Sequence, residues 1–138
     1  MSRRRARELA LQVLFQVDVV RANPERALEY LLAEHQVSDE TAAFARSLVK
    51  GTLAKIREID DYIKRYSIEW DLPRMANVDR NILRLGLFEM LYYGKTPLNV
   101  AIDEAVELAK TFSEENSCRF INGILGRIAR EVPRNPGD

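Results

Sequence analysis

Four arginines stand within the first seven residues of the chain, which opens MSRRRARELALQVLFQ. Guanidinium groups bind phosphate through paired N–H donors, and the start of a helix adds free backbone N–H groups aimed at an anion. The same charges oppose the positive end of the helix dipole, where acidic residues would be favoured. We therefore predict that Arg3, Arg4, Arg5 and Arg7 bind phosphate groups. A solvated basic tail is the alternative that these residues alone leave open.

Apolar residues beside charged ones indicate two further contact sites. Leu11 and Phe15 fall outside the main apolar stripe of the first expected helix, so they should be partly exposed and suit a protein contact. Phe120 lies off the stripe of the last helix and next to Arg119, which suits stacking of unpaired bases. The amide of Asn122 can both donate to and accept from a base edge. From its position alone, Phe120 could equally be a flank of the core.

Other chemistry has few residues to support it. His35 is the single histidine and Cys118 the single cysteine, which argues against a metal centre, a Ser-His-Asp triad or an internal disulfide and suits a reducing cytosol. The sequence has no P-loop and no Gly-x-Gly-x-x-Gly motif. Asp103, Glu104 and Glu107 recur at helical spacing opposite an apolar stripe, as on a solvated face. We predict no enzyme activity, no catalytic residue, no metal and no cofactor.

The charges of the chain balance, but they are unevenly spread. The 138 residues are 46% apolar, which suits one domain over residues 1–138, and 21 basic residues face 21 acidic ones. Residues 1–7 carry four arginines and no acid, whereas residues 101–115 carry five acids against one lysine. The final residues, 116–138, are basic again, so the two termini would form one patch if they fold together. No apolar run approaches a membrane span, and we expect a cytoplasmic protein.

The elements that must position these residues are all predicted to be helices, since apolar residues recur every three or four positions. The helix at 78–93 is apolar on every side, which is expected of a helix surrounded by others. Thr96 before Pro97 is a helix start signal, and Leu72 with Pro73 breaks the pattern. The expected helices cover about 3–21, about 24–35, about 38–63 with an interruption or bend at Gly51, 78–93, about 97–112 and about 116–133.

Three segments carry a resemblance to a known family. They are RRRARELALQVLFQ, NVDRNILRLGLFEM and VAIDEAVELAKTFSEENSCRFINGIL, and together they resemble the NusB family of bacterial transcription antitermination factors, in the same order and over essentially the whole chain. The resemblance implies an all-α fold of about six or seven helices in two small bundles packed across each other. It also implies binding of the boxA element of nascent ribosomal RNA transcripts together with ribosomal protein S10, which helps the elongating polymerase to resist termination.

The resemblance also assigns residues. The family's basic segment corresponds to the four arginines, its RNA-proximal residues to Phe120 and Asn122, and its S10-facing surface to Phe15 and Asp79. Only Met1 and Ser2 precede the arginines, so we expect any contact made there in longer members to be absent.

Two other classes of protein remain open. A similar helical domain is fused to RNA cytosine methyltransferases, but a chain ending near residue 138 leaves no room for their cofactor domain. A homodimer or adaptor that acts through protein contacts without touching RNA is the stronger rival. Salt dependence of RNA binding would separate that rival from an RNA-binding protein.

Overall fold

The computed structural model describes residues 2–67 and 74–134, and within these ranges every regular element is a helix. An all-α fold is thereby confirmed; the predicted break at Leu72 and Pro73 lies outside the described residues. In chain order the elements are α1 (Arg3–Val20), α2 (Pro24–Glu34), α3 (Asp39–Ala54), α4 (Ile56–Tyr66), α5 (Asn77–Phe88), the π-helical segment η2 (Glu89–Tyr93), α6 (Leu98–Phe112) and α7 (Glu115–Glu131).

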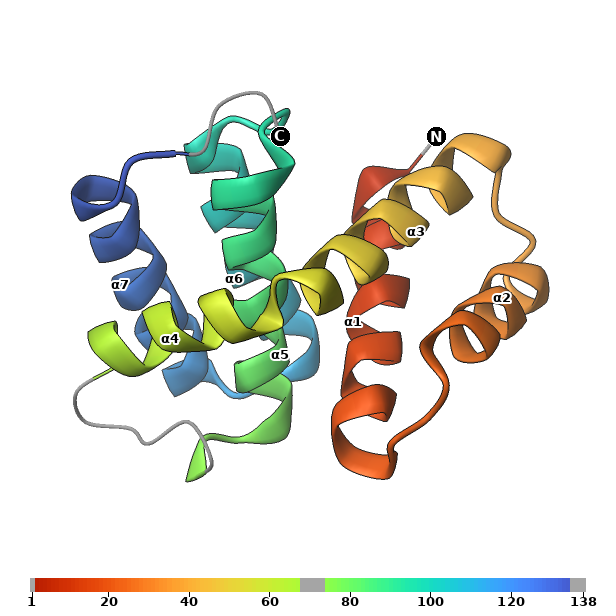
Figure 1. The fold of residues 1–138 in the computed structure, drawn as a ribbon, viewed down its shortest axis with the longest axis horizontal. Helices are drawn as coiled ribbons and strands as arrows, with labels where there is room; N and C mark the ends of the chain where they lie inside the picture. The colour runs from red at the N-terminus through yellow and green to blue at the C-terminus, as the bar shows by residue number, and fades with distance from the viewer. Residues whose placement is uncertain (1, 68–73, 135–138) are drawn as a thin grey trace.

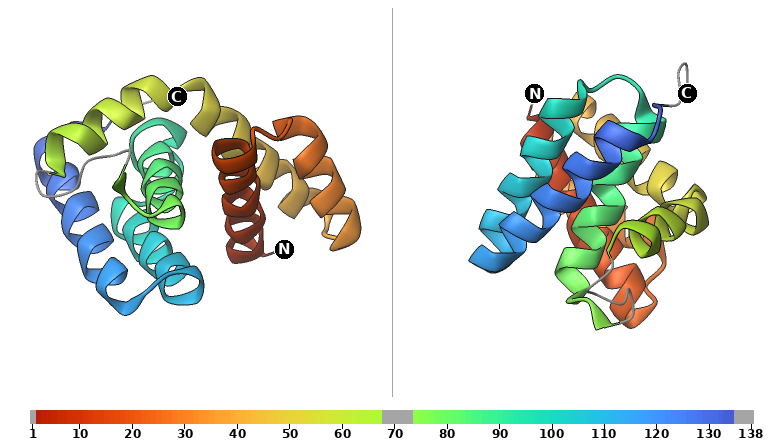
Figure 2. Two further views of the ribbon diagram at one scale, coloured as in Figure 1. Left: turned by 90° about the horizontal axis from the view of Figure 1, so that it is seen from below. Right: turned by 90° about the vertical axis from the view of Figure 1, so that its left-hand side faces the viewer.

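The helices form two groups that pack across each other, as predicted. Helices α1, α2 and α3 make one group and α4 to α7 the other, with α3 and α4 running across the molecule from one group to the other (Figure 1). Figure 2 shows α1 and α5 facing each other where the two groups meet. The beginning of α1 and the end of α7 lie at the same end of the molecule. Among the described residues, no helix is both long and apolar enough to cross a membrane.

Local signals fix the starts of the first three helices. The hydroxyl of Ser2 accepts from the backbone N–H of Arg5, and Asn23 and Ser38 cap α2 and α3 in the same way. Pro24 follows Asn23 at the first helical position, where its missing N–H is not needed. These short-range contacts explain why the first three helices begin close to the positions predicted from sequence.

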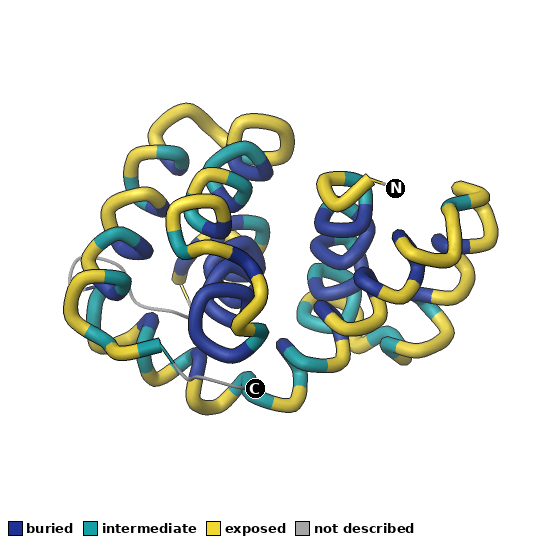
Figure 3. Tube along the Cα trace, turned by 90° about the horizontal axis from the view of Figure 1, so that it is seen from above, coloured by how far each residue is buried: buried dark blue, intermediate teal, exposed yellow. Residues whose placement is uncertain are grey.

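The helix surrounded by others is α5, as predicted. Residues 79–92 are all buried, and the tube drawn by burial is dark blue along this segment (Figure 3). The segment does not stay α-helical to Tyr93, however, because its last turn is the π-helical η2. Glu89 is the first residue of η2 and is itself buried. Widened turns of this kind occur often at functional sites.

One sequence prediction about a helix boundary, the break at Gly51, was wrong. Helix α3 continues through Gly51 and ends at Ala54, so the break before α4 lies at Lys55. Gly51 is instead a close-packing position, since a Cβ there would stand 2.1 Å from the ring of Phe88. The helix start predicted from Thr96 and Pro97 is confirmed, since α6 begins at Leu98; the hydroxyl of Thr96 donates to Glu89 at 2.7 Å.

Candidate nucleic-acid interface

The first turn of α1 faces the start of α6 across a surface hollow of about 440 Å³. We call this the arginine hollow. Its walls include Arg3, Arg4, Arg7, Lys95, Val100 and Glu104. Three of the four arginines predicted to bind phosphate therefore line one concave surface, together with a lysine that the sequence analysis did not select.

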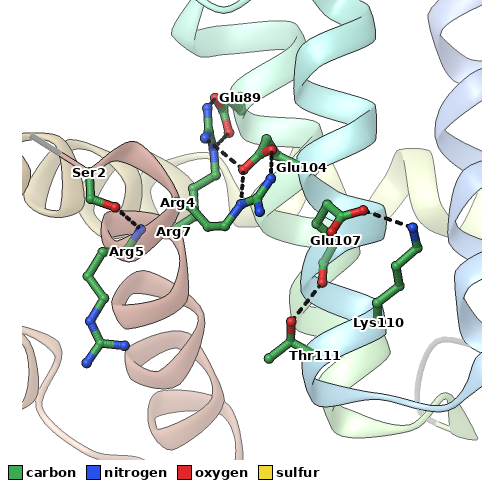
Figure 4. A network of polar contacts seen from close by, with 9 residues as sticks. All are labelled: Ser2, Arg4, Arg5, Arg7, Glu89, Glu104, Glu107, Lys110 and Thr111. Carbon is green, nitrogen blue, oxygen red and sulfur yellow. Dashed lines mark hydrogen bonds and ion pairs between the residues drawn. The ribbon is translucent and has the colours of Figure 1, made fainter.

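Glu104 is shared by two of these arginines (Figure 4). Nε and Nη2 of Arg4 donate to its two carboxylate oxygens at 3.3 and 2.9 Å, and Nη1 of Arg7 donates to one of them at 3.3 Å. The hydrogen bond from Arg4 lowers the pKa of Glu104 and outweighs the opposing effect of partial burial, so Glu104 is ionised at neutral pH. Its prediction as part of a solvated face was wrong, since only 16% of its side chain is exposed.

Arg7 is not at the surface, which corrects its prediction as an RNA contact. Its Nε and Nη2 donate to the carboxylate of Glu89 at 2.9 and 2.5 Å, and both side chains are at least 95% buried. Nε, Nη1 and Nη2 of Arg7 therefore all donate to carboxylates of the protein itself. The apolar stripe of α1 could not reveal this, because Glu89 lies 82 residues away in sequence.

The other three arginines keep solvent access. The Arg4 side chain is 58% exposed despite its ion pair, and Arg3 is also exposed. Arg3 lies over the ring of Phe44, and Arg5 is half-exposed beside Glu8 and the ring of His35. A phosphate group can therefore reach Arg3, Arg4 and Arg5, but not Arg7.

The sequence analysis expected one basic patch only if the two termini fold together, and the described contacts of Arg134, near the C-terminal end, are with η2 and the residues before α6. Nη2 of Arg134 donates to the backbone carbonyls of Glu89, at 3.5 Å, and of Thr96. Arg119 belongs to the beginning of α7, far along the helix from Arg134. The predicted basic patch therefore divides between the two ends of α7.

A second hollow of about 710 Å³ lies at the other end of α6. We call this the aromatic hollow, because the side chains of Phe15, Phe112 and Phe120 line it together with Met75, Val78 and Asp79. Its walls come from α1, the start of α5, the end of α6 and the start of α7. A predicted partner residue, Phe15, and a predicted base-stacking residue, Phe120, thus share one concave surface.

Asp79 joins two walls of the aromatic hollow through hydrogen bonds. The hydroxyls of Ser113 and Ser117 donate to its two carboxylate oxygens at 2.5 and 2.7 Å, and Ser113 also contacts Ser117 at 3.0 Å. Asp79 is only 8% exposed. The described contacts of this carboxylate tie the start of α5 to the turn between α6 and α7, and its role toward S10 stays a prediction.

Leu11 does not belong to a surface, and its prediction as partly exposed was wrong. It is 3% exposed, whereas Phe15, one turn later, is half-buried as predicted. The physical reason is that α1 packs against α2 and α3 on one side and against α5 on the other, so its buried face is wider than a single stripe. Phe120 is half-buried against the core, while Arg119 and Asn122 are exposed.

The predicted RNA residues therefore form two groups rather than one. The arginine hollow and the aromatic hollow flank opposite ends of α6, a helix of 15 residues and so about 22 Å long. One strand of several nucleotides would be needed to contact both. Across the residues described here, no cluster of three His, Cys, Asp or Glu side chains has the arrangement of a metal site.

Two concave surfaces on a small helical scaffold, one lined mainly by arginine and lysine and one by aromatic rings, are suited to binding a partner. Comparison with known proteins specifies the class further: the chain belongs to the NusB family, whose model matches residues 4–130. As a member of this family the chain is not an enzyme.

Relatives match along the full length of the chain. The transcription antitermination protein NusB of Desulforudis audaxviator is 52% identical over 95% of this chain and 95% of its own. That of Bacillus licheniformis is 46% identical over 96% of this chain and 99% of its own.

Solved structures show the same fold. NusB of T. maritima superposes with a TM-score of 0.88 at 42% identity, covering 95% of this chain and 92% of that one. A crystal structure of the antitermination factors NusB and NusE in complex with double-stranded RNA matches with a TM-score of 0.83 at 30% identity, covering 94% and 98% of the two chains.

Proposed function

We propose that this chain is a transcription antitermination factor that binds boxA-type single-stranded RNA of ribosomal transcripts together with ribosomal protein S10. The observation that carries the proposal is the match, over 94% of the chain, to a NusB solved with NusE in complex with double-stranded RNA. We take NusE as the S10 partner, and we propose that the RNA read by this chain is single-stranded because its exposed arginines and aromatic rings suit unpaired bases. The cation-lined and aromatic hollows supply chemistry suited to those two partners. In this role the protein acts in the cytoplasm, on an RNA emerging from the elongating polymerase.

The RNA backbone would enter at the arginine hollow. Arg4 is largely exposed although it pairs with the mostly buried Glu104, and water screens the charge of an exposed side chain. A phosphate can therefore exchange with Glu104 as the partner of Arg4 at small cost. Arg3 and Arg5 add two further guanidinium groups on the same turn of α1.

A base would stack at the far end of α6. Phe120 presents a half-buried ring at the aromatic hollow, and the exposed side chains of Arg119 and Asn122 flank it on α7. Stacking on an aromatic ring is tolerant of base identity, while an amide can read a base edge. These three residues are proposed to hold one unstacked nucleotide.

S10 would dock on the remainder of the aromatic hollow. Phe15 is a half-buried aromatic residue beside a polar rim, which is the usual character of an interface anchor. Because Phe120 lines the same hollow, RNA and S10 would meet there. Leu11 supports this surface from the core and does not contact the partner.

The rival function is a homodimer or adaptor that closes the aromatic hollow without binding RNA. Two measurements on the purified chain separate these functions. Fluorescence anisotropy with a labelled boxA-type RNA tests RNA binding, and light scattering tests self-association. RNA binding by a monomer supports the proposal, whereas a dimer with no affinity for RNA at low salt supports the rival.

A further inference from the structure

A third hollow, of about 280 Å³, lies between the start of α1, α3 and η2. It is lined by Arg3, Glu40, Ala43, Phe44, Ser47 and Tyr93. We call it the Tyr93 pocket. Arg3 lines both this pocket and the arginine hollow, so the two surfaces are adjacent.

An arginine plane and two aromatic rings lie against one another at this pocket. The guanidinium carbon of Arg3 lies 4.2 Å from the centre of the Phe44 ring, and the Phe44 and Tyr93 rings are 5.4 Å apart at an interplanar angle of 57°. Nη1 of Arg3 also donates to the hydroxyl of Tyr93 at 3.4 Å. Lys95 lies on Tyr93 as well, with Nζ 5.8 Å from the ring centre. Arginine planes and aromatic rings are the surfaces on which proteins stack unpaired bases.

The polar groups of the pocket favour a base over a phosphate. Glu40 and Ser47 are exposed on α3, one turn to either side of Phe44. A carboxylate repels phosphate, but it accepts hydrogen bonds from the amino groups of cytosine, adenine or guanine. The arginine hollow is more cationic, because Arg3, Arg4 and Lys95 line it and its carboxylate, Glu104, already accepts from Arg4 and Arg7.

We propose that the Tyr93 pocket binds one amino-bearing nucleobase of the RNA, next to the phosphates held in the arginine hollow. Tyr93 and Arg3 provide the stacking surfaces, and Glu40 accepts from the base amino group. This assignment rests on the proposed RNA-binding function and adds a base-binding site at the opposite end of α6 from Phe120. Arg3 then has a second role, contacting a base as well as a phosphate.

The test compares Tyr93→Ala and Tyr93→Phe with a matched tyrosine elsewhere. Tyr30 on α2 is 68% exposed and lies in none of the three hollows, so Tyr30→Ala is the control. Tyr93→Ala is expected to weaken binding of a boxA-type RNA by about tenfold or more, as for the loss of one stacked base. Tyr93→Phe and Tyr30→Ala are expected to bind within about twofold of the unmodified chain, since one keeps the ring and the other is remote.

A double-mutant cycle keeps the test decisive even if Tyr93→Ala is less stable. A series of RNAs, each with one abasic residue, is titrated against the unmodified chain and Tyr93→Ala, with melting curves confirming that both are folded. At one position the abasic RNA is expected to bind the unmodified chain as weakly as Tyr93→Ala binds the intact RNA. The two losses are then not additive, because both remove the same contact.

Glu40→Ala adds a test, because the direction in which RNA affinity changes depends on whether Glu40 acts only as a negative charge or accepts a hydrogen bond from the base. Removing an acidic residue beside RNA strengthens binding if only charge matters, whereas loss of an acceptor for the base weakens it. Weaker binding of the intact RNA, with no such change for the abasic RNA found in the cycle, supports the proposal. Strictly additive losses at every abasic position overturn it while leaving RNA binding intact. Absence of RNA binding by the unmodified chain overturns the proposed function itself.

Discussion

Arg7 and Glu89 form a bidentate ion pair inside the protein, although 82 residues separate them in sequence. The pair ties the first turn of α1 to η2, and Glu89 extends the tie by accepting from Thr96 ahead of α6. The residues that line the arginine hollow are therefore positioned by a charged group beneath it. We therefore assign Arg7 as a positioning residue for the proposed phosphate site.

We expect removal of either member of this pair to destabilise the fold. A buried charge left without its partner typically costs about 3–5 kcal/mol, so Arg7→Ala and Glu89→Ala should each lower the free energy of unfolding by about that amount. Urea unfolding followed by circular dichroism measures this. A double replacement, Arg7→Met with Glu89→Leu, should recover much of the loss because no charge is left unpaired. If Arg7→Ala unfolds like the unmodified chain but loses RNA, Arg7 contacts RNA directly.

The surface arginines should act on RNA through charge. Each phosphate contact with single-stranded nucleic acid contributes about −0.7 to the slope of log K against log salt, so alanine at Arg3, Arg4 and Arg5 should flatten the slope by about 2. Phe120→Ala is the matched comparison, because it should weaken binding by about one to two orders of magnitude while leaving the slope unchanged. Titrations at several salt concentrations measure both. Equal slopes for the triple variant and the unmodified chain would return these arginines to a solvated tail.

Alanine variants of Leu11 and Phe15 should show that Leu11 is a core residue and Phe15 an interface residue. Leu11→Ala leaves a cavity in the core and should cost about 2–5 kcal/mol of stability. Phe15→Ala should lose on the order of 1–3 kcal/mol of S10 binding with a smaller effect on folding, as for an interface anchor. Thermal melts and calorimetric titration with S10 measure the two effects. Full S10 affinity in a folded Phe15→Ala variant would remove the aromatic hollow from the S10 interface.

Some of this arrangement could be predicted from sequence because it is local. The structure confirms the helix caps at Asn23 and Ser38, which depend only on neighbouring residues. It also confirms that the helix at 78–93, which is apolar on every side, is surrounded by others. The burial of Leu11 could not be predicted, because it depends on a second helix covering the far side of α1. Nor could the pairing of Arg4 with Glu104, since a regular acidic face looks the same whether water or an arginine 100 residues away meets it.

Asp18 should make the stability of the junction between the helix groups depend on pH. It accepts from Arg80 at 2.7 Å and from Asn81 at 2.9 Å, on α5. Partial burial alone would raise the pKa of Asp18, but these hydrogen bonds and the charge of Arg84 outweigh it and lower the pKa. Because the folded pKa is depressed, the stabilisation is complete above the unfolded value of about 3.9 and is lost as the pH falls through the folded pKa.

Asp18→Asn should therefore lower the free energy of unfolding by about 1–2 kcal/mol at pH 7, with the difference shrinking as the medium is acidified. Denaturant unfolding across the acid range measures it, with Asp61→Asn, an exposed position on α4, as the control. A stability difference that is the same at every pH would show that the Asp18 charge is not responsible.

We propose that this chain binds RNA and S10 together, with both partners meeting at the aromatic hollow. The direct measurement is the affinity of a labelled boxA-type RNA for the chain with and without saturating S10, paired with the affinity for S10 with and without RNA. Thermodynamic linkage requires the two ratios to be equal. We expect S10 to tighten RNA binding and RNA to tighten S10 binding by the same factor, with the factor falling toward one in Phe120→Ala. Displacement of the RNA by S10, or an RNA affinity that does not change when S10 is bound, would contradict joint binding of the two partners.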